Sequence, residues 1–106
     1  MSALLENFKK LLENDPDNAL LHFSLGNEYF KSGEFEQAEK HLRQAVKLSP
    51  EYSAAWKMLG KSLSAAGQHQ EAIDVFHDGI KAAEDKGDIQ AAKEMKVFLK
   101  RAEKSL

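Results

Sequence analysis

The chain has 106 residues, enough for one domain that buries about two-thirds of the surface of its unfolded state. Its formal charge of −2 gives no electrostatic basis for binding nucleic acid or an anionic membrane, and the absence of cysteine excludes disulfide bonds, thiol catalysis and cysteine-ligated metals. No apolar run approaches the ~20 residues of a membrane span, and charged residues interrupt the N-terminal apolar pattern as they do not in a signal peptide, so we expect a cytoplasmic protein.

The first predicted element is an amphipathic helix over residues 2–14. Its apolar residues recur three and four positions apart on one face, and its charged residues lie on the other. Asp15 and Pro16 end this helix, since the residue before a proline is disfavoured in the helical region. Asn18 then provides an N-cap for the next helix. The apolar face consists of Leu4, Leu5, Phe8, Leu11 and Leu12.

Two helical hairpins follow, each with a glycine at its turn, Gly33 in the first and Gly67 in the second. Their apolar residues repeat with a period of about 34, which in a helical chain indicates stacked helix hairpins. In the first helix of each hairpin a glycine, Gly26 or Gly60, should face the partner helix, because its cost of ~1 kcal/mol in a helix interior needs a packing reason. The predicted helices span residues 19–32, 35–48, 52–65 and 69–86.

The final predicted helix covers residues 88–104 and should cap the second hairpin. Glu84 stands where the first hairpin has Pro50, so the helix before it should run on to a stop at Gly87. Asp88 then serves as the N-cap of the last helix. The apolar face of that helix consists of Ile89, Ala92, Met95, Phe98, Leu99, Ala102 and Leu106.

Both hairpins carry one spaced motif. The second hairpin reads Trp56-x2-Leu59-Gly60-x2-Leu63 and then Ala72-x3-Phe76. The first hairpin reads His22-x2-Leu25-Gly26-x2-Tyr29, then Ala38-x3-Leu42 and Pro50. This pattern resembles the signature of the tetratricopeptide repeat family, W-x2-L-G-x2-Y…A-x3-F…P, and departs from it at His22, Leu63 and Glu84.

The resemblance implies an all-α fold, a short right-handed α-solenoid of six antiparallel helices. It divides the chain into a half-repeat helix (residues 2–17), two repeats (19–52 and 53–86) and a C-terminal capping helix (88–106). It also implies that the first helix of each hairpin lines a concave groove, while the second helices form the convex back.

No motif for catalysis or cofactor binding occurs: the chain has no Gly-rich phosphate loop, no Gly-x-Ser-x-Gly and no His-Glu-x-x-His. His41, His69 and His77 are dispersed, and His22 stands at the family's aromatic position, where we interpret it as a packing residue. We therefore expect no enzymatic activity, no cofactor and no metal. A small hydrolase or metalloprotein that uses these histidines is a remote alternative, which metal analysis would test.

Each groove-lining helix has a stripe of side chains that is turned away from the hairpin core. The first stripe combines apolar side chains with an amide, and the second carries two lysines, at spacings of three and four. We predict that the two stripes form a peptide-binding groove. The alternatives are that the lysines only solvate the surface and that Phe23 or Phe30 packs against the N-terminal helix. The predicted groove residues are Leu20, Phe23, Asn27, Phe30, Ala54, Lys57, Lys61 and Ser64.

The predicted function is a non-catalytic protein-interaction module with an adaptor or scaffold role. Its partner would be a peptide or helix with bulky apolar residues beside an acidic stretch. The clamp with which some family members grip a C-terminal carboxylate matches here only at Asn27, because Phe23, Met58, Asp88 and Ala92 stand at its other positions. The alternative is a structural role in which the chain self-associates, as a possible homodimer, through the outer faces of its first and last helices.

Overall fold

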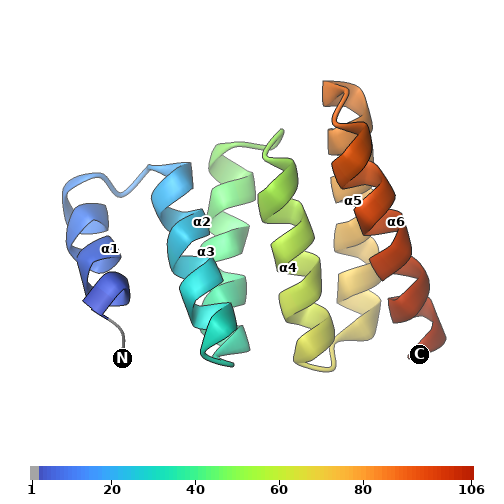
Figure 1. Ribbon diagram of the computed structural model, residues 1–106, viewed down its shortest axis with the longest axis horizontal. Coiled ribbons are helices and arrows are strands. Elements are labelled where there is room, and N and C mark those ends of the chain that lie inside the picture. Colours follow the sequence, from blue (N-terminus) through green and yellow to red (C-terminus); the bar gives the residue numbers. More distant parts are fainter. Residues whose placement is uncertain (1–2) are drawn as a thin grey trace.

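The computed structural model describes residues 3–106, and over these residues the chain forms six α-helices and no strand (Figure 1). The predicted all-α fold is confirmed, and the helix bounds agree with the predicted ones to within one residue. The expected start of the first helix at residue 2 lies outside the described residues. The helices are α1 (Ala3–Asn14), α2 (Ala19–Lys31), α3 (Phe35–Leu48), α4 (Ser53–Ala65), α5 (His69–Lys86) and α6 (Ile89–Lys104).

Local sequence signals set the helix ends. The Asn18 side chain accepts a hydrogen bond from the Leu21 backbone N–H at 3.0 Å, and Asp88 accepts one from Ala91 at 3.1 Å, as expected of N-caps. At the turn of the first hairpin Gly33 has a φ of 76°, in the left-handed region that favours glycine. Helix α5 extends to Lys86, past the point that corresponds to the end of α3, as the missing proline predicts.

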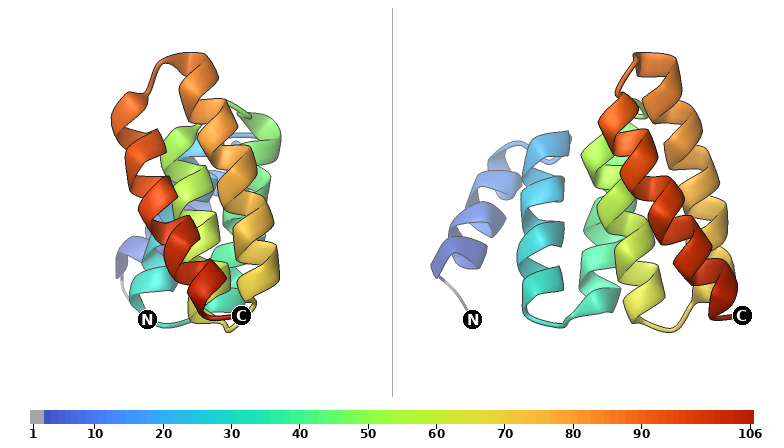
Figure 2. Two further views of the ribbon diagram at one scale, coloured as in Figure 1. Left: turned by 90° about the vertical axis from the view of Figure 1, so that its right-hand side faces the viewer. Right: turned by 45° about the vertical axis from the view of Figure 1, so that its right-hand side comes forward.

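The helices stack in two layers. Helices α2, α4 and α6 lie in one layer, and α3 and α5 lie in the other (Figure 2). Consecutive helices pack antiparallel along the array, and α4 also contacts both α2 and α6 (Figure 1). The structure is an α-solenoid in which no described helix between residues 3 and 106 is long and apolar enough to cross a bilayer.

The close approach of paired helices depends on glycine. A Cβ atom added to Gly26 would lie 2.5 Å from Cγ of Leu42 on α3, and one added to Gly60 would overlap the ring of Phe76 on α5. The sequence prediction for these two glycines is confirmed. Because Leu42 and Phe76 are fully buried, they fill the space that the absent side chains leave.

Parts of the two end helices are more exposed than their apolar patterns predicted. On α1 Leu5 is buried, but Leu4 and Leu11 are 47% and 52% exposed, because no described helix covers that side. On α6 Ala92 and Met95 are buried as expected. Ile89 and Leu106 are exposed instead, since Ile89 adjoins the α5–α6 turn that projects beyond the other helices and Leu106 follows the end of α6 (Figure 1).

Candidate functional site

The candidate site lies on the layer formed by α2, α4 and α6, which we call the inner face. Its α2 part is mainly apolar. Leu20 is 61% exposed, and Asn27 is half-buried. The half-buried ring of Phe23 lies 5.0 Å from that of Tyr52, and the ring of Phe30 lies 5.4 Å from that of Phe35. These ring contacts join the two phenylalanines to residues next to α4 and on α3 rather than to α1.

The two lysines of α4 reach toward α6. Nζ of Lys57 lies 3.2 Å from Oε2 of Glu94, so this lysine is already paired. Nζ of Lys61 lies 5.5 Å from the ring centroid of Phe30 and 5.2 Å from that of Phe98. Each such cation–π contact contributes about 0.5–1 kcal/mol at a partly exposed site. Lys61 therefore links all three helices of the inner face.

The α6 part of the inner face is cationic. Arg101 also lies over Phe98, with its Cζ atom 5.5 Å from the ring centroid. Among residues 3–106 no carboxylate lies within ion-pair distance of Lys61 or Arg101, whereas Glu94 neutralises Lys57. The inner face thus has an apolar part on α2 and two cations without a carboxylate partner at the α4–α6 boundary.

Sequence reasoning missed the contribution of α6 to this face. The α6 helix carries no repeat motif, so nothing in the sequence aligned Glu94 and Phe98 with the lysines of α4. Each of these residues follows its lysine by the same number of positions, a spacing slightly longer than the repeat period. The longer spacing has a physical cause, because α5 runs past the corresponding end of α3 before the chain turns into α6.

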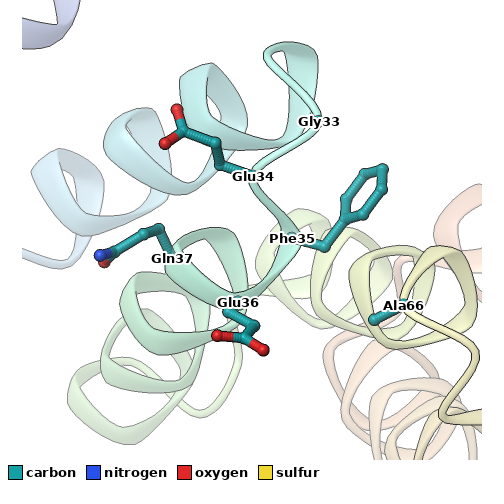
Figure 3. Close-up of a pocket in the computed structure, with 6 residues that line it drawn as sticks. All are labelled: Gly33, Glu34, Phe35, Glu36, Gln37 and Ala66. Atoms are coloured by element: carbon teal, nitrogen blue, oxygen red, sulfur yellow. The ribbon is translucent and has the colours of Figure 1, made fainter.

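Surface hollows of the described residues 3–106 include three that lie away from the predicted groove residues. One of about 420 Å³ lies where the turn of the first hairpin meets the end of α4, and its Glu34 and Gln37 side chains point away from Ala66 (Figure 3). A second involves Pro50, Glu51, Ala82, Asp85 and Lys86, and a third Arg43, Glu71, Asp74, Val75 and Asp78. Their polar groups do not form a nucleophile–base arrangement.

Two of the histidines, His22 and His41, contact each other and serve packing. His22 is buried, as predicted for a packing residue, and its Nε2 lies 2.8 Å from the carbonyl oxygen of Pro16. Because a carbonyl only accepts, Nε2 of His22 donates this hydrogen bond, and a second hydrogen bond joins Nδ1 of His22 to Nδ1 of His41, 3.1 Å away. Burial, followed by the influence of His22, lowers the pKa of His41 to about 4.

No metal centre is formed by the described part of the chain. Over residues 3–106 no group of three or more histidine or carboxylate side chains is placed to hold a metal ion. The geometry thus defines a class of protein, a helix-hairpin solenoid that presents a mixed apolar and cationic surface on its inner layer.

The chain belongs to the tetratricopeptide repeat family, whose model matches residues 23–89. It is 42% identical over 102 residues to the TPR repeat-containing protein PA0015 of Pseudomonas aeruginosa, an alignment that covers 96% of this chain and 97% of that relative. The resemblance that the sequence motif indicated is therefore confirmed.

Solved structures share the fold. Protein BPP2914 of Bordetella parapertussis superposes with a TM-score of 0.84 at 40% identity, covering 98% of this chain and 90% of that one. The TPR2B domain of yeast Sti1, described in complex with pHsp70, superposes with a TM-score of 0.91 at 13% identity, covering 96% and 82% of the two chains. At such low identity the Sti1 domain supports the fold alone.

Proposed function

We propose that this chain is a non-catalytic protein-interaction module that binds a segment of a partner protein along its inner face. The observation that carries the proposal is Lys61, held between Phe30 and Phe98 without a carboxylate partner in the described chain. The same fold occurs in complex with pHsp70 in the Sti1 domain, so the fold is compatible with binding a partner. The proposed contact residues are Leu20, Phe23, Asn27, Phe30, Ala54, Lys57, Lys61 and Ser64.

The two parts of the inner face favour a ligand with two chemical parts. Leu20 and Phe23 offer apolar surface to one or two bulky side chains of the partner. Lys61 and Arg101 offer positive charge to an acidic side chain or a free carboxylate of the partner, because no carboxylate of the described chain is paired with either cation. Lys57 contributes less, since a ligand would compete with Glu94 for it.

The half-buried Asn27 lies between Phe23 and Phe30 along the α2 stripe, where its amide could pair with a peptide backbone. We propose the same division of the chain that the motif indicates, with the second helices of the hairpins as scaffold and the first helices as binding surface. We also propose that the chain acts as an adaptor or scaffold and that it does so in the cytoplasm.

The test uses a synthetic peptide with two leucines followed by several glutamates and a free C-terminus. Titration into the labelled protein should shift the NMR amide signals of α2, α4 and α6. A peptide with glutamine in place of glutamate and an amidated end provides the matched control and should bind more weakly. Shifts confined to α3 and α5, or equal binding of the two peptides, would contradict the proposal.

Two substitutions sharpen this test. Phe23→Ala removes an apolar anchor, and typical anchors are worth ~2 kcal/mol, or about thirtyfold in affinity. Lys61→Glu should weaken binding in a salt-dependent way, chiefly through the association rate. Lys47→Glu, at an exposed site on α3, makes the same charge change and should leave binding unchanged.

A further inference from the structure

The N-terminal end of the array has an apolar face whose equivalents elsewhere are covered. Leu4, Phe8 and Leu11 of α1 precede Ala38, Leu42 and Ala45 of α3 by one repeat period. The three α3 residues are fully buried, whereas Leu4 and Leu11 are about half exposed and Phe8 is half-buried. The difference arises because α2 lies against α3 with Gly26 opposite Leu42, while no helix among residues 3–106 lies against this side of α1.

This face of α1 is uncharged. Leu4, Asn7, Leu11 and Asn14 alternate three and four residues apart and therefore form one stripe along the helix. The charged residues of α1 are two acids and two lysines, which balance, and Glu6 is paired with Lys9 at 3.7 Å. A second molecule of the same chain would thus meet this face without repulsion between like charges.

The opposite end of the array has no comparable face. On α6 the neighbours of the exposed Val97 in helical spacing are the exposed Lys93, Lys100 and Arg101, together with Glu94, which is paired with Lys57. Two such faces would bring several cations of each copy together, and like charges placed opposite one another across an interface disfavour association. The two ends therefore differ in charge: the exposed face of α1 is uncharged, whereas the exposed face of α6 would place like charges opposite one another in a second copy.

We infer that α1 is a self-association surface, on which the α1 helix of a second copy of this chain packs antiparallel across a two-fold axis. Leu4 and Leu11 lie equally far from the midpoint between Asn7 and Phe8. An antiparallel pair centred on that midpoint therefore places Leu4 of each copy against Leu11 of the other, as an isologous contact requires. The antiparallel arrangement also opposes the two helix dipoles favourably.

The contact is small, and its size sets the expected strength. A helix of 12 residues is about 18 Å long, so the pair buries less than the ~1,200 Å² of a standard stable interface. The dimer should accordingly be weak and reversible, and dilution should dissociate it. This inference does not depend on binding at the inner face, because no proposed contact residue of that face belongs to α1.

The test is sedimentation equilibrium of the full chain from about 10 µM to about 1 mM, a range that brackets weak protein pairs. The average mass should rise with concentration from the 11.9 kDa of one chain toward twice that value. The double variant Leu4→Glu, Leu11→Glu should remain monomeric throughout. Ile89→Glu with Val97→Glu is the matched control, with two exposed apolar residues replaced at the other end, and should dimerise as the natural chain does.

An independent measurement needs no variant. On dilution of the natural chain, NMR amide shifts should change over residues 3–14 and stay constant over α4 and α6. A chain that is monomeric at the highest concentration overturns the inference. A dimer that survives the α1 substitutions, or that is lost with the α6 control or with Lys61→Glu, also overturns it by assigning the contact to another surface.

Discussion

The two hairpins, α2–α3 and α4–α5, use the same packing with different chemistry on the inner face. In the first, Nε2 of His22 donates to the Pro16 carbonyl at 2.8 Å, and in the second, Nε1 of Trp56 donates to the Pro50 carbonyl at 2.7 Å. One period apart, an imidazole and an indole thus make the same bond to the turn before their helix. The positions that hold the helices together conserve geometry even where the residue type changes.

At the inner-face positions, by contrast, the two hairpins carry side chains of different chemical type. Phe23 and Asn27 on α2 correspond to Lys57 and Lys61 on α4. The two hairpins keep equivalent close glycine contacts although these residues differ, so the backbone arrangement does not depend on the residue type at these positions. The repeat thus supplies a constant scaffold on which the chemistry of the exposed side chains varies from one hairpin to the next.

The largest expected loss of stability comes from emptying the shared core, by Phe76→Ala in one hairpin and Leu42→Ala in the other. Both side chains are fully buried against a glycine, and the larger one leaves the larger cavity. We expect losses of about 3–5 kcal/mol for Phe76→Ala and about 2–5 kcal/mol for Leu42→Ala, measured by urea unfolding. A loss below about 1 kcal/mol at either site would show that the core around that glycine is not tightly packed.

The next test adds volume in place of removing it. Gly26→Leu and Gly60→Leu should each force the paired helices apart and cost about 1–3 kcal/mol through overpacking. We expect the greater loss at Gly60, because the Phe76 ring has fewer ways to move aside than the branched end of Leu42. Gly→Ala at the same two sites grades the effect, and a melting temperature unchanged within a degree would contradict the hairpin contact.

A smaller effect should follow from the pH dependence of His41, which belongs to the first hairpin. Because the pKa of His41 is about 4 in the folded chain and its ordinary value is 6.5, the unfolded chain takes up a proton first as pH falls. Stability is full above pH 6.5 and declines down to about pH 4, where both states are protonated. The ring is half-buried, so we expect a loss of about 1 kcal/mol between pH 7 and pH 5.

Thermal unfolding of His41→Phe provides the comparison for that pH effect. This variant should be less stable at pH 7, since it leaves Nδ1 of His22 without its hydrogen-bond partner, but its stability should change less between pH 7 and pH 5. His77→Gln, which replaces an exposed histidine on α5, should retain the natural pH dependence. Equal pH dependence in His41→Phe and the natural chain would assign the titration to another group.

The smallest expected effect is that of the link between the second hairpin and α6. A double-mutant cycle with Lys57→Ala and Glu94→Ala should give a coupling of about 0.2–1 kcal/mol, as for other exposed pairs, and salt should reduce it. A parallel cycle with Lys61→Met and Phe98→Leu should give a coupling of similar size that salt reduces less. Zero coupling in both cycles would show that the α6 side chains make no stabilising contact with the lysines of α4.

Much of the fold was predictable because its determinants are local. The N-cap at Asn18, the turn at Gly33 and the extension of α5 past Glu84 each depend on residues within a few positions in the chain. The period of about 34 placed Gly26 and Gly60 at equivalent positions, and a glycine inside a helix predicted a close partner helix at each; the structure identifies Leu42 and Phe76 as the residues opposite them.

The sequence by itself determined the six helices, the hairpin contacts and two of the three helices that line the inner face, because spacing along the chain fixes which residues share a side of a helix. Only the tertiary structure decided what those side chains meet. It paired Lys57 with Glu94, placed Lys61 between two phenylalanines, and left Leu4 and Leu11 uncovered. These outcomes depend on how far α5 runs before the chain returns as α6 and on which helix faces have a neighbour, and neither is encoded in the pattern of a single repeat.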